Sequence, residues 1–168
     1  MRSIMIRSVK QSDRADILRV LAAAFEGEDE ARLVEKLWTA EAIALERVAA
    51  IGDDIVGYCA FSRVSVAPPV DGVVLGLAPV AVTPQRQNEG VGSELIRDCL
   101  AAAKSQAAAV VLLGHKEYYP RFGFTPASAK GVSWDARDAG DAFQLIDFTG
   151  IFDGTLRKIS YHPAFSAF

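Results

Sequence analysis

The chain has 168 residues, of which 51% are hydrophobic, and its formal net charge at pH 7 is −3. This length suits a single domain with a sizeable core. The basic residues do not gather into a patch typical of nucleic-acid binding, and every apolar run is far shorter than the roughly 20 residues that a membrane-spanning helix needs. The first residues alternate between apolar and polar, unlike a signal peptide. We therefore expect a cytoplasmic protein with no nucleic-acid or membrane partner.

Two cysteines, Cys59 and Cys99, lie far apart in the sequence and inside apolar patterns. This arrangement is typical of structural cysteines rather than reactive ones. A disulfide framework or a zinc site is therefore not expected, no metal ligands are predicted, and a reducing cytoplasm is the simplest interpretation.

The first forty residues predict a strand followed by two helices. Residues 4–9 alternate like a short strand, and residues 13–25 carry apolar side chains at helical spacing. Asp13 is typical of a helix start. Gly27 interrupts the pattern, and the acidic residues 28–30 open a second helix whose apolar face lies within residues 33–38.

The rest of the chain predicts a mixed sheet. Further strands are expected at residues 42–51, 55–66, 73–82, 107–113, 142–148 and 155–161, with a helix at 90–104. A glycine and two aspartates at 52–54 indicate a hairpin turn, and the continuous apolar run at 107–113 indicates a buried strand that can pair in parallel. This order predicts one α+β domain, residues 1–168, with a central mixed sheet.

A glycine-containing loop between a strand and a helix is the best candidate binding site. The strand ends near Val82, Thr83-Pro84 turns the chain, and Gly90 and Gly92 lead into the helix. Backbone N–H groups at a helix start bind phosphate oxygens, and glycine has no side chain to obstruct a pyrophosphate. The alternative is a glycine-rich loop without a ligand, because a short glycine motif is a weak signal.

Two other phosphate-binding motifs do not fit this loop. A dinucleotide fingerprint needs a third glycine where Leu95 stands, and an acidic residue near Val110, where the chain is wholly apolar. A P-loop needs Gly-Lys-Ser/Thr, whereas Gly92 is followed by Ser93-Glu94. The mismatch disfavours a dinucleotide-dependent oxidoreductase.

A second signal is the aromatic string YYPRFGF at residues 118–124. Taken alone, these rings are better explained as core residues. The string contains Y-x-x-x-G-F, from Tyr119 to Phe124, and it follows the loop pattern Q-x-x-G-x-G at Gln87–Gly92. In this order the two motifs resemble the signatures of the GNAT superfamily of N-acetyltransferases. The longer string GHKEYYPRFGF, residues 114–124, is similar to a bacterial subgroup of predicted acetyltransferases.

The resemblance covers roughly residues 4–161, with its specific motifs in 77–124. It implies a GNAT-type fold: an α+β architecture with a mixed, mostly antiparallel sheet flanked by helices, and splayed strands that form a cleft for CoA. It also implies acetyl-CoA as cosubstrate. The residues implied to bind it are Val80, Ala81, Val82, Gln87, Asn88, Glu89, Gly90, Val91, Gly92, Ser93, His115, Tyr119 and Phe122.

The family's tyrosine donates a hydrogen bond or proton to the departing CoA thiolate, and this role falls on Tyr119. Tyr118 stands where phenylalanine is common and is interpreted as packing. His115 stands where many relatives have asparagine, so cofactor contact, proton relay and helix start remain alternatives. Direct transfer needs no covalent nucleophile.

The acceptor side is less defined. Carboxylates at 26–30 could attract a cationic amine or help deprotonate it through water, and Glu30 is the catalytic candidate among them, although acidic residues there also complement a helix dipole. The polar loop containing Trp134, Asp135, Asp138 and Asp141 could cover the acceptor or simply be solvated. The apolar tail at 161–168 could dock on the sheet or on a second subunit in a homodimer.

The sequence therefore predicts an acetyl-CoA-dependent N-acetyltransferase acting on a primary amine. The alternative is a catalytically silent acyl-CoA-binding or regulatory module with the same fold. Retention of Tyr119 favours the enzyme.

Overall fold

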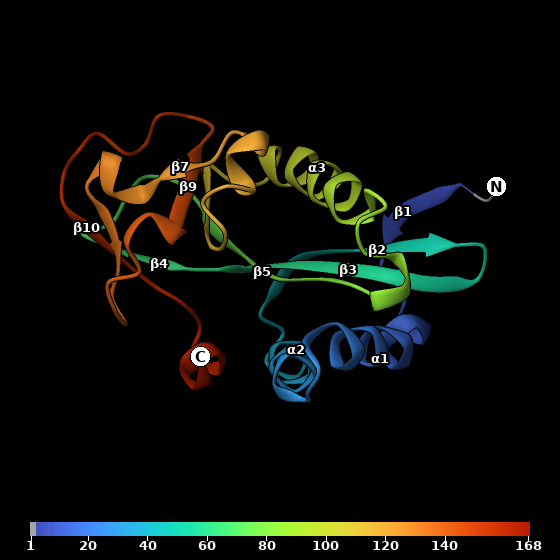
Figure 1. Ribbon diagram of the computed structural model, residues 1–168. Helices are drawn as coiled ribbons and strands as arrows, with labels where there is room; N and C mark the ends of the chain where they lie inside the picture. The colour runs from blue at the N-terminus through green and yellow to red at the C-terminus, as the bar shows by residue number, and fades with distance from the viewer. Residues whose placement is uncertain (1–2) are drawn as a thin grey trace. The chain divides into compact units, whose positions relative to one another are not determined.

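The computed structural model describes residues 3–168 and divides into two compact units (Figure 1). The N-terminal unit comprises residues 3–61 and 78–102, and the C-terminal unit comprises residues 62–77 and 103–166. Two strands, β3 (Asp54–Arg63) and β5 (Val74–Val82), each begin in one unit and end in the other.

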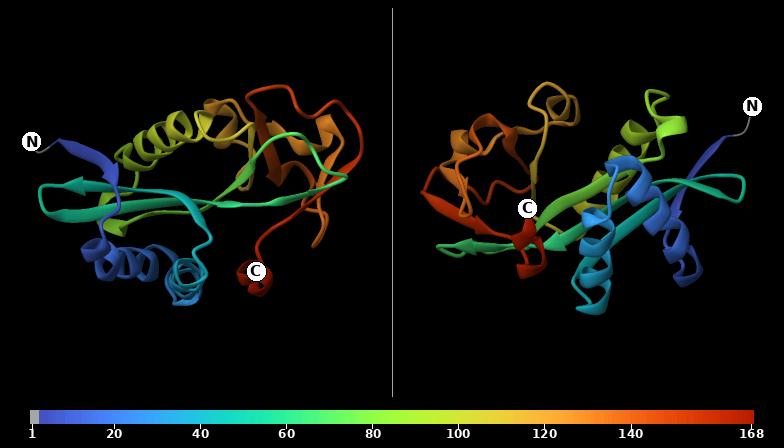
Figure 2. Two further views of the ribbon diagram at one scale, coloured as in Figure 1. Left: turned by 180° about the vertical axis from the view of Figure 1, so that it is seen from behind. Right: turned by 60° about the horizontal axis from the view of Figure 1, so that its bottom comes forward.

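The N-terminal unit is a sheet covered by helices on both faces. Besides parts of β3 and β5, it contains β1 (Ile4–Ser8), α1 (Arg14–Phe25), α2 (Asp29–Thr39), β2 (Ile43–Ile51) and α3 (Val91–Lys104), with the short 3-10 helices η1 (Gln11–Asp13) and η2 (Pro84–Arg86). The strand order is β1-β2-β3-β5, and β1 pairs antiparallel with β2. Figures 1 and 2 show α1 and α2 on one side of these strands and α3 on the other.

The apolar residues that recur at helical spacing in α1 and α2 form the core of this unit. Ile17 and Leu21 of α1 are fully buried with Val34 of α2, and they pack in one cluster with Tyr58 and Ala81 from the sheet. Burying each large aliphatic side chain contributes about 1.5–3 kcal/mol. The helix interpretation of residues 13–25 is thus confirmed, since α1 covers 14–25.

A polar network lies within the same unit. Glu46 of β2 accepts hydrogen bonds from the indole Nε1 of Trp38, at 3.0 Å, and from the hydroxyl of Tyr58, at 2.7 Å. Burial, together with the adjacent carboxylate, raises the pKa of Tyr58 well above its ordinary value. The guanidinium of Arg14 lies over the Trp38 ring, 4.7 Å from its centroid. The network ties α1 and α2 to β2 and β3.

Asp13 begins α1, as predicted, but its carboxylate serves a different purpose from a side-chain helix cap. It accepts two hydrogen bonds from Arg7, at 2.7 and 3.0 Å, and one from the backbone N–H of Lys10. The hydrogen bond from Arg7 is the main reason that the pKa of Asp13 falls to about 2.

The expectation that the cysteines form no disulfide is wrong. Cys59 of β3 and Cys99 of α3 are joined by a disulfide, and both are fully buried. They are 40 residues apart in sequence, and only the packing of α3 on the sheet brings them together. The inference of a reducing compartment therefore loses the support that it drew from these residues.

The C-terminal unit contains two small sheets. Its strands, besides parts of β3 and β5, are β4 (Ser65–Ala67), β6 (Ala109–Leu113), β7 (Thr125–Pro126), β8 (Val132–Trp134), β9 (Phe143–Asp147) and β10 (Arg157–Ser160). Its short 3-10 helices are η3 (Tyr119–Phe122), η4 (Ala127–Lys130), η5 (Gly140–Ala142) and η6 (Pro163–Ala167). One sheet has the order β5-β6-β9-β7, and the other has the order β4-β10-β8.

Strand β6 organises the larger of these sheets. It pairs in parallel with β5 over Ala109–Val111 and antiparallel with β9 over all five of its residues. The predicted parallel pairing of this apolar run is confirmed. The C-terminal tail packs on its own chain, where the ring of Phe165 lies 5.2 Å from that of Tyr161. Short strands β7 and β8 were not predicted, because runs of two or three residues carry no usable periodicity.

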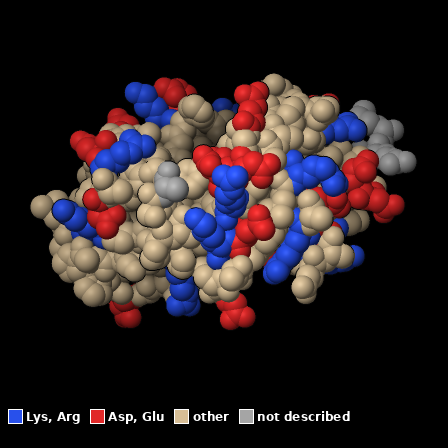
Figure 3. Space-filling model, turned by 90° about the horizontal axis from the view of Figure 1, so that it is seen from below, with Lys and Arg blue, Asp and Glu red and all other residues tan. Residues whose placement is uncertain are grey.

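The described residues offer neither a membrane-spanning helix nor a cluster of metal ligands. Between residues 3 and 168, no helix is long and apolar enough to cross a membrane. Within the same residues, His, Cys, Asp and Glu side chains form no group of three or more that could hold a metal ion. On the face shown in Figure 3, Lys and Arg are interleaved with Asp and Glu rather than gathered into an area of one sign.

Candidate active site

The predicted phosphate loop lies in the N-terminal unit, between the end of β5 and the start of α3. Residues 84–90 are exposed, and α3 begins at Val91 with its first turn of N–H groups at the loop. The N–H of Glu94 donates to the carbonyl of Gly90 at 3.0 Å, which is the first helical hydrogen bond of this end. The N–H groups of Val91 and Gly92, in the first turn, have no carbonyl further back in the helix to donate to, so they can donate to an anion.

The backbone conformation explains why glycine stands in this loop. Gly90 has φ +86°, a left-handed conformation that L side chains rarely adopt. A Cβ atom built on Gly90 would meet no atom within 4 Å, so the space above this residue is open. Asn88, with φ 65°, is also left-handed, which asparagine tolerates better than most residues. The loop therefore presents an unobstructed backbone.

Side chains of the loop hold it against the strand. The amide Nε2 of Gln87 donates to the carbonyl of Val82 at 3.0 Å. In the backbone, the N–H of Thr83 donates to the carbonyl of Val56 at 2.8 Å. Arg86 and Glu89 are 3.7 Å apart and form an exposed ion pair. Gln87 of the motif thus acts as a brace between the loop and the end of β5.

The predicted strand residues at the end of β5 differ in burial. Ala81 is 3% exposed and belongs to the core cluster with α1 and α2, whereas Val80 and Val82 are half-buried. The resemblance assigns CoA binding to the backbone of these three residues, so the alternating burial of their side chains does not change that assignment.

The tyrosine segment lies in the C-terminal unit, directly after β6. The carbonyl of His115 accepts hydrogen bonds from the N–H groups of Tyr118, at 3.1 Å, and Tyr119, at 3.3 Å, which turns the chain into η3. Gly123 ends η3 with φ 102°. The ring of Tyr119 makes edge contacts with Tyr118 at 5.1 Å between centroids. The Y-x-x-x-G-F spacing is thus one short turn closed by a glycine.

The lack of a side chain on Gly114 leaves the space that the Tyr119 ring occupies. A Cβ atom on Gly114 would lie 2.4 Å from Cε2 and 2.9 Å from Cδ2 of that ring. Any larger residue would therefore displace the tyrosine. Burial, and to a lesser extent the neighbouring Tyr118, raises the pKa of Tyr119 to about 12. Its hydroxyl consequently remains protonated throughout the physiological range.

Gln144 of β9 is a site residue that the sequence analysis missed. It is 1% exposed, and its amide Nε2 donates to the carbonyls of Gly114, at 3.2 Å, and His115, at 3.4 Å. These bonds fix the turn that carries Tyr119. Its Oε1 is buried with no hydrogen-bond partner among the described residues. The available signal was a polar residue in the middle of an otherwise apolar strand.

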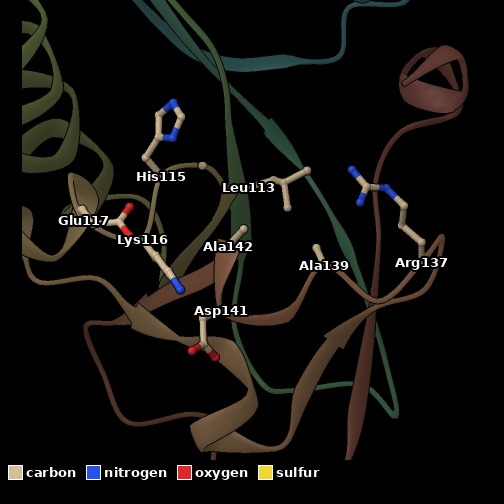
Figure 4. A pocket seen from close by; sticks show the side chains of 9 residues that line it. Leu113, His115, Lys116, Glu117, Arg137, Ala139, Asp141 and Ala142 are labelled. Atoms are coloured by element: carbon tan, nitrogen blue, oxygen red, sulfur yellow. The ribbon is translucent and has the colours of Figure 1, made fainter.

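A pocket of about 560 Å³ lies in the C-terminal unit beside this turn (Figure 4). Leu113 and Gly114 line it together with the charged side chains of Glu117, Arg137 and Asp141. His115 and Lys116 also line it. Of the four residues expected in a polar acceptor loop, Asp141 lines this pocket, whereas Trp134, Asp135 and Asp138 line a neighbouring one.

The candidate residues thus fall into two groups. The N-terminal unit holds the loop at 87–93, the end of β5, and Glu30, which is half-buried in the first turn of α2. The C-terminal unit holds His115, Tyr119 and Phe122. No hydrogen bond or ion pair of the Glu30 carboxylate is found within residues 3–168.

An α+β fold with an open glycine loop at a helix start defines a class of proteins that bind phosphorylated ligands at such a helix. Residues 30–126 match the family model described as an acetyltransferase (GNAT) domain. This match covers more than half of the chain, and the chain therefore belongs to the GNAT acetyltransferase family.

Similar proteins agree with this assignment. The chain is 37% identical to uncharacterized N-acetyltransferase YjhQ of Escherichia coli over 122 residues, which are 70% of this chain and 67% of that protein. It is 30% identical to uncharacterized N-acetyltransferase YhbS of Escherichia coli, over 98% of this chain and all of that protein.

Two solved structures share the fold over nearly the whole chain. A crystal structure of Escherichia coli YhbS in complex with CoA has a TM-score of 0.91 and 29% identity, covering 98% of this chain and 93% of that one. A GNAT family acetyltransferase from Brucella melitensis in complex with acetyl-CoA has a TM-score of 0.81 and 34% identity, covering 98% and 99%. The expected fold class is confirmed.

Proposed function

We propose that this chain transfers an acetyl group from acetyl-CoA directly to a primary amine, with residues 1–168 acting as one catalytic domain in the cytoplasm. The open, left-handed backbone at Gly90, directly before α3, is the observation that carries the proposal. It leaves the helix N–H groups accessible to the pyrophosphate of CoA. The two similar structures in complex with CoA and acetyl-CoA support the same ligand.

The transfer is a nucleophilic substitution at a thioester. A neutral amine attacks the carbonyl carbon, and the tetrahedral intermediate collapses as the C–S bond breaks and CoA leaves as a thiolate. The amine loses one proton, and the thiolate takes one up or remains ionised. The protein therefore has two tasks at this centre: to accept the amine proton and to stabilise the leaving sulfur.

Tyr119 would perform the second task as a hydrogen-bond donor. Its pKa is about 12, whereas a thiol has a pKa near 8.5. Complete proton transfer from this phenol to a thiolate would be uphill by about 5 kcal/mol, at 1.36 kcal/mol per pKa unit. A hydrogen bond that strengthens as negative charge develops on sulfur avoids this cost and favours the transition state.

Glu30 would perform the first task through water. Its carboxylate stands in the first turn of α2 and is not committed to another group among residues 3–168. A half-buried, unpaired carboxylate can receive a proton relayed from the amine. The two acidic residues that precede it in the sequence are less suitable, because Asp29 pairs with Arg32 at 3.9 Å and Glu28 is exposed.

The decisive experiment is thiol release from acetyl-CoA in the presence of a panel of amines. The enzyme hypothesis expects amine-dependent release with at least one acceptor, and acetylated amine as the product. The silent-module hypothesis expects acetyl-CoA binding with no release above the uncatalysed rate for any amine. Glu30→Gln, which keeps the size of the side chain, should lower the rate most at pH values where the amine is protonated.

A further inference from the structure

We infer that the pocket beside Gly114 receives the acceptor and selects an amine whose far end carries a carboxylate, as in an ω-amino acid. The inference rests on the proposed acetyl transfer and specifies its substrate class. It depends on three features of the C-terminal unit: the place of the pocket, the charges that line it, and their arrangement.

The pocket shares a wall with Tyr119. Gly114 lines the cavity, and the Tyr119 ring packs so closely on Gly114 that no Cβ atom would fit between them. The turn that forms this wall is held by Gln144, whose amide binds the Gly114 and His115 carbonyls. A ligand in the pocket therefore lies against the turn on which the Tyr119 ring packs. The volume of about 560 Å³ suits a small metabolite.

Three of the charged groups that line the pocket form no hydrogen bond or ion pair among residues 3–168. Among residues 3–168, the carboxylates of Glu117 and Asp141 and the ammonium of Lys116 have no hydrogen-bond or ion-pair partner. Other acids of the same loop are committed: Asp138 accepts from the N–H of Gly140 at 2.9 Å, and Asp135 accepts from the hydroxyl of Ser160. Among the three acids of this loop, the uncommitted one is therefore Asp141, which lines this pocket.

Arg137 is positioned without being neutralised. Its guanidinium carbon lies 5.0 Å from the centroid of the Trp134 ring, a contact that orients the cation and leaves its N–H groups free to donate. A planar guanidinium binds a carboxylate with two parallel hydrogen bonds. The pocket therefore contains a preorganised receptor for a carboxylate.

Arg137 stands apart from the other charged side chains of the pocket, which include the cation Lys116 as well as the acids Glu117 and Asp141. Figure 4 shows Arg137 on one side of the pocket and Glu117, with His115 and Lys116, on the other. Leu113, Ala139 and Ala142 lie between them. An acceptor whose carboxylate binds Arg137 would extend an apolar skeleton over these residues and place its amine toward Glu117 and the turn at Gly114. The carboxylate of Glu117 would also attract the protonated, cationic form of the acceptor amine before that amine loses its proton.

This arrangement excludes a simple polycation as the preferred acceptor, because a second ammonium group would meet Arg137. Overall, acetyl-CoA and the ammonium form of the amino acid yield an N-acetylated amino acid, CoA thiol and one proton. No further reactant is required.

The test compares amines that differ only in a carboxylate: γ-aminobutyrate with propylamine, δ-aminovalerate with butylamine, and ε-aminocaproate with pentylamine. Thiol release from acetyl-CoA gives kcat/KM for each, in the wild type and in Arg137→Gln. Losing a hydrogen-bonded ion contact reduces kcat/KM by about 10-fold to 100-fold. The loss should appear in KM for the carboxylated amines and should be small for their decarboxylated partners.

Arg63→Gln is the control, because Arg63 is exposed in the same unit and does not line this pocket. Amine basicity differs within each pair, but it is the same for both enzymes, so the change in preference between variants reports the carboxylate contact alone. Equal preferences in the wild type and Arg137→Gln would overturn the inference, as would a wild type that favours the decarboxylated amines.

Calorimetric titration of the same amino acids into the enzyme saturated with CoA measures binding independently of turnover. We expect saturable binding that Arg137→Gln weakens and Arg63→Gln does not. Carboxylate-dependent binding without any thiol release would contradict the proposed transfer and leave the pocket assignment standing. Thiol release with amines but no carboxylate-dependent binding would contradict the pocket assignment alone.

Discussion

Replacing Gly114 by alanine should disable the tyrosine without removing it. The added Cβ atom would lie 2.4 Å from Cε2 of Tyr119, whereas carbon atoms in contact are about 3.5–4.0 Å apart. The ring must therefore retreat by about 1 Å. Misplacement on that scale can cost about 100-fold in rate, so we expect kcat to fall by about two orders of magnitude. Overpacking at such a site costs about 1–3 kcal/mol of stability, and CoA binding through the separate loop at 87–93 should change little.

The assay is steady-state thiol release, with CoA affinity measured by calorimetry on the same preparations. A double-mutant cycle then tests the mechanism. If Gly114→Ala acts by moving the Tyr119 hydroxyl, adding it to Tyr119→Phe should cost little more, because the hydroxyl is already gone. Full additivity of the two substitutions would refute the reasoning, and so would wild-type kcat in a folded Gly114→Ala variant.

Three further predictions follow from the described contacts. Tyr119→Phe should lower kcat by about 10-fold to 1,000-fold and spare CoA affinity, and Tyr118→Phe should cost less. Equal, full activity in both variants would contradict the assignment of Tyr119 to the leaving sulfur. Gly90→Val should remove most of the affinity for CoA, measured by calorimetry. The control is Gly154→Val: Gly154 has a similar φ of 93°, and a Cβ atom there also meets nothing within 4 Å, so this variant should carry the same backbone strain and still bind CoA normally. Because its pKa is lowered in the folded state, Asp13 stabilises the protein above its ordinary pKa, and this contribution is lost as pH falls from about 4 through about 2. Thermal unfolding of Asp13→Asn should therefore vary less with pH in that range than unfolding of the wild type, and parallel curves would contradict this account.

Local signals in the sequence predicted the features that depend on neighbouring residues. Helical spacing at 13–25 corresponds to α1, the glycine turn at 52–54 to the β2–β3 hairpin, and the apolar run at 107–113 to β6. The glycines of the phosphate loop follow the same logic, since the positive φ of Gly90 is a local backbone requirement. Periodicity and turn chemistry act over a few residues, so one chain suffices to read them.

Features that join distant segments were decided only by the tertiary structure. Gln144 supports Gly114 across 30 residues of sequence, and Cys59 meets Cys99 across 40. In each case the sequence shows a polar or sulfur-containing residue in an apolar run, but not which residue it faces, because strand pairing and helix docking set the partner.

The pocket illustrates the same division between sequence and structure. Asp141 and Arg137 are ordinary charged loop residues in the sequence, indistinguishable from Asp138. Folding commits Asp138 to a backbone N–H and directs Asp141 and Arg137 to the cavity beside Gly114. The amino-acid sequence by itself determined the class of chemistry, through motifs whose geometry is local. Only the tertiary structure decides that residues 113–117 and 137–142 line one pocket, because long-range packing brings these two distant segments together.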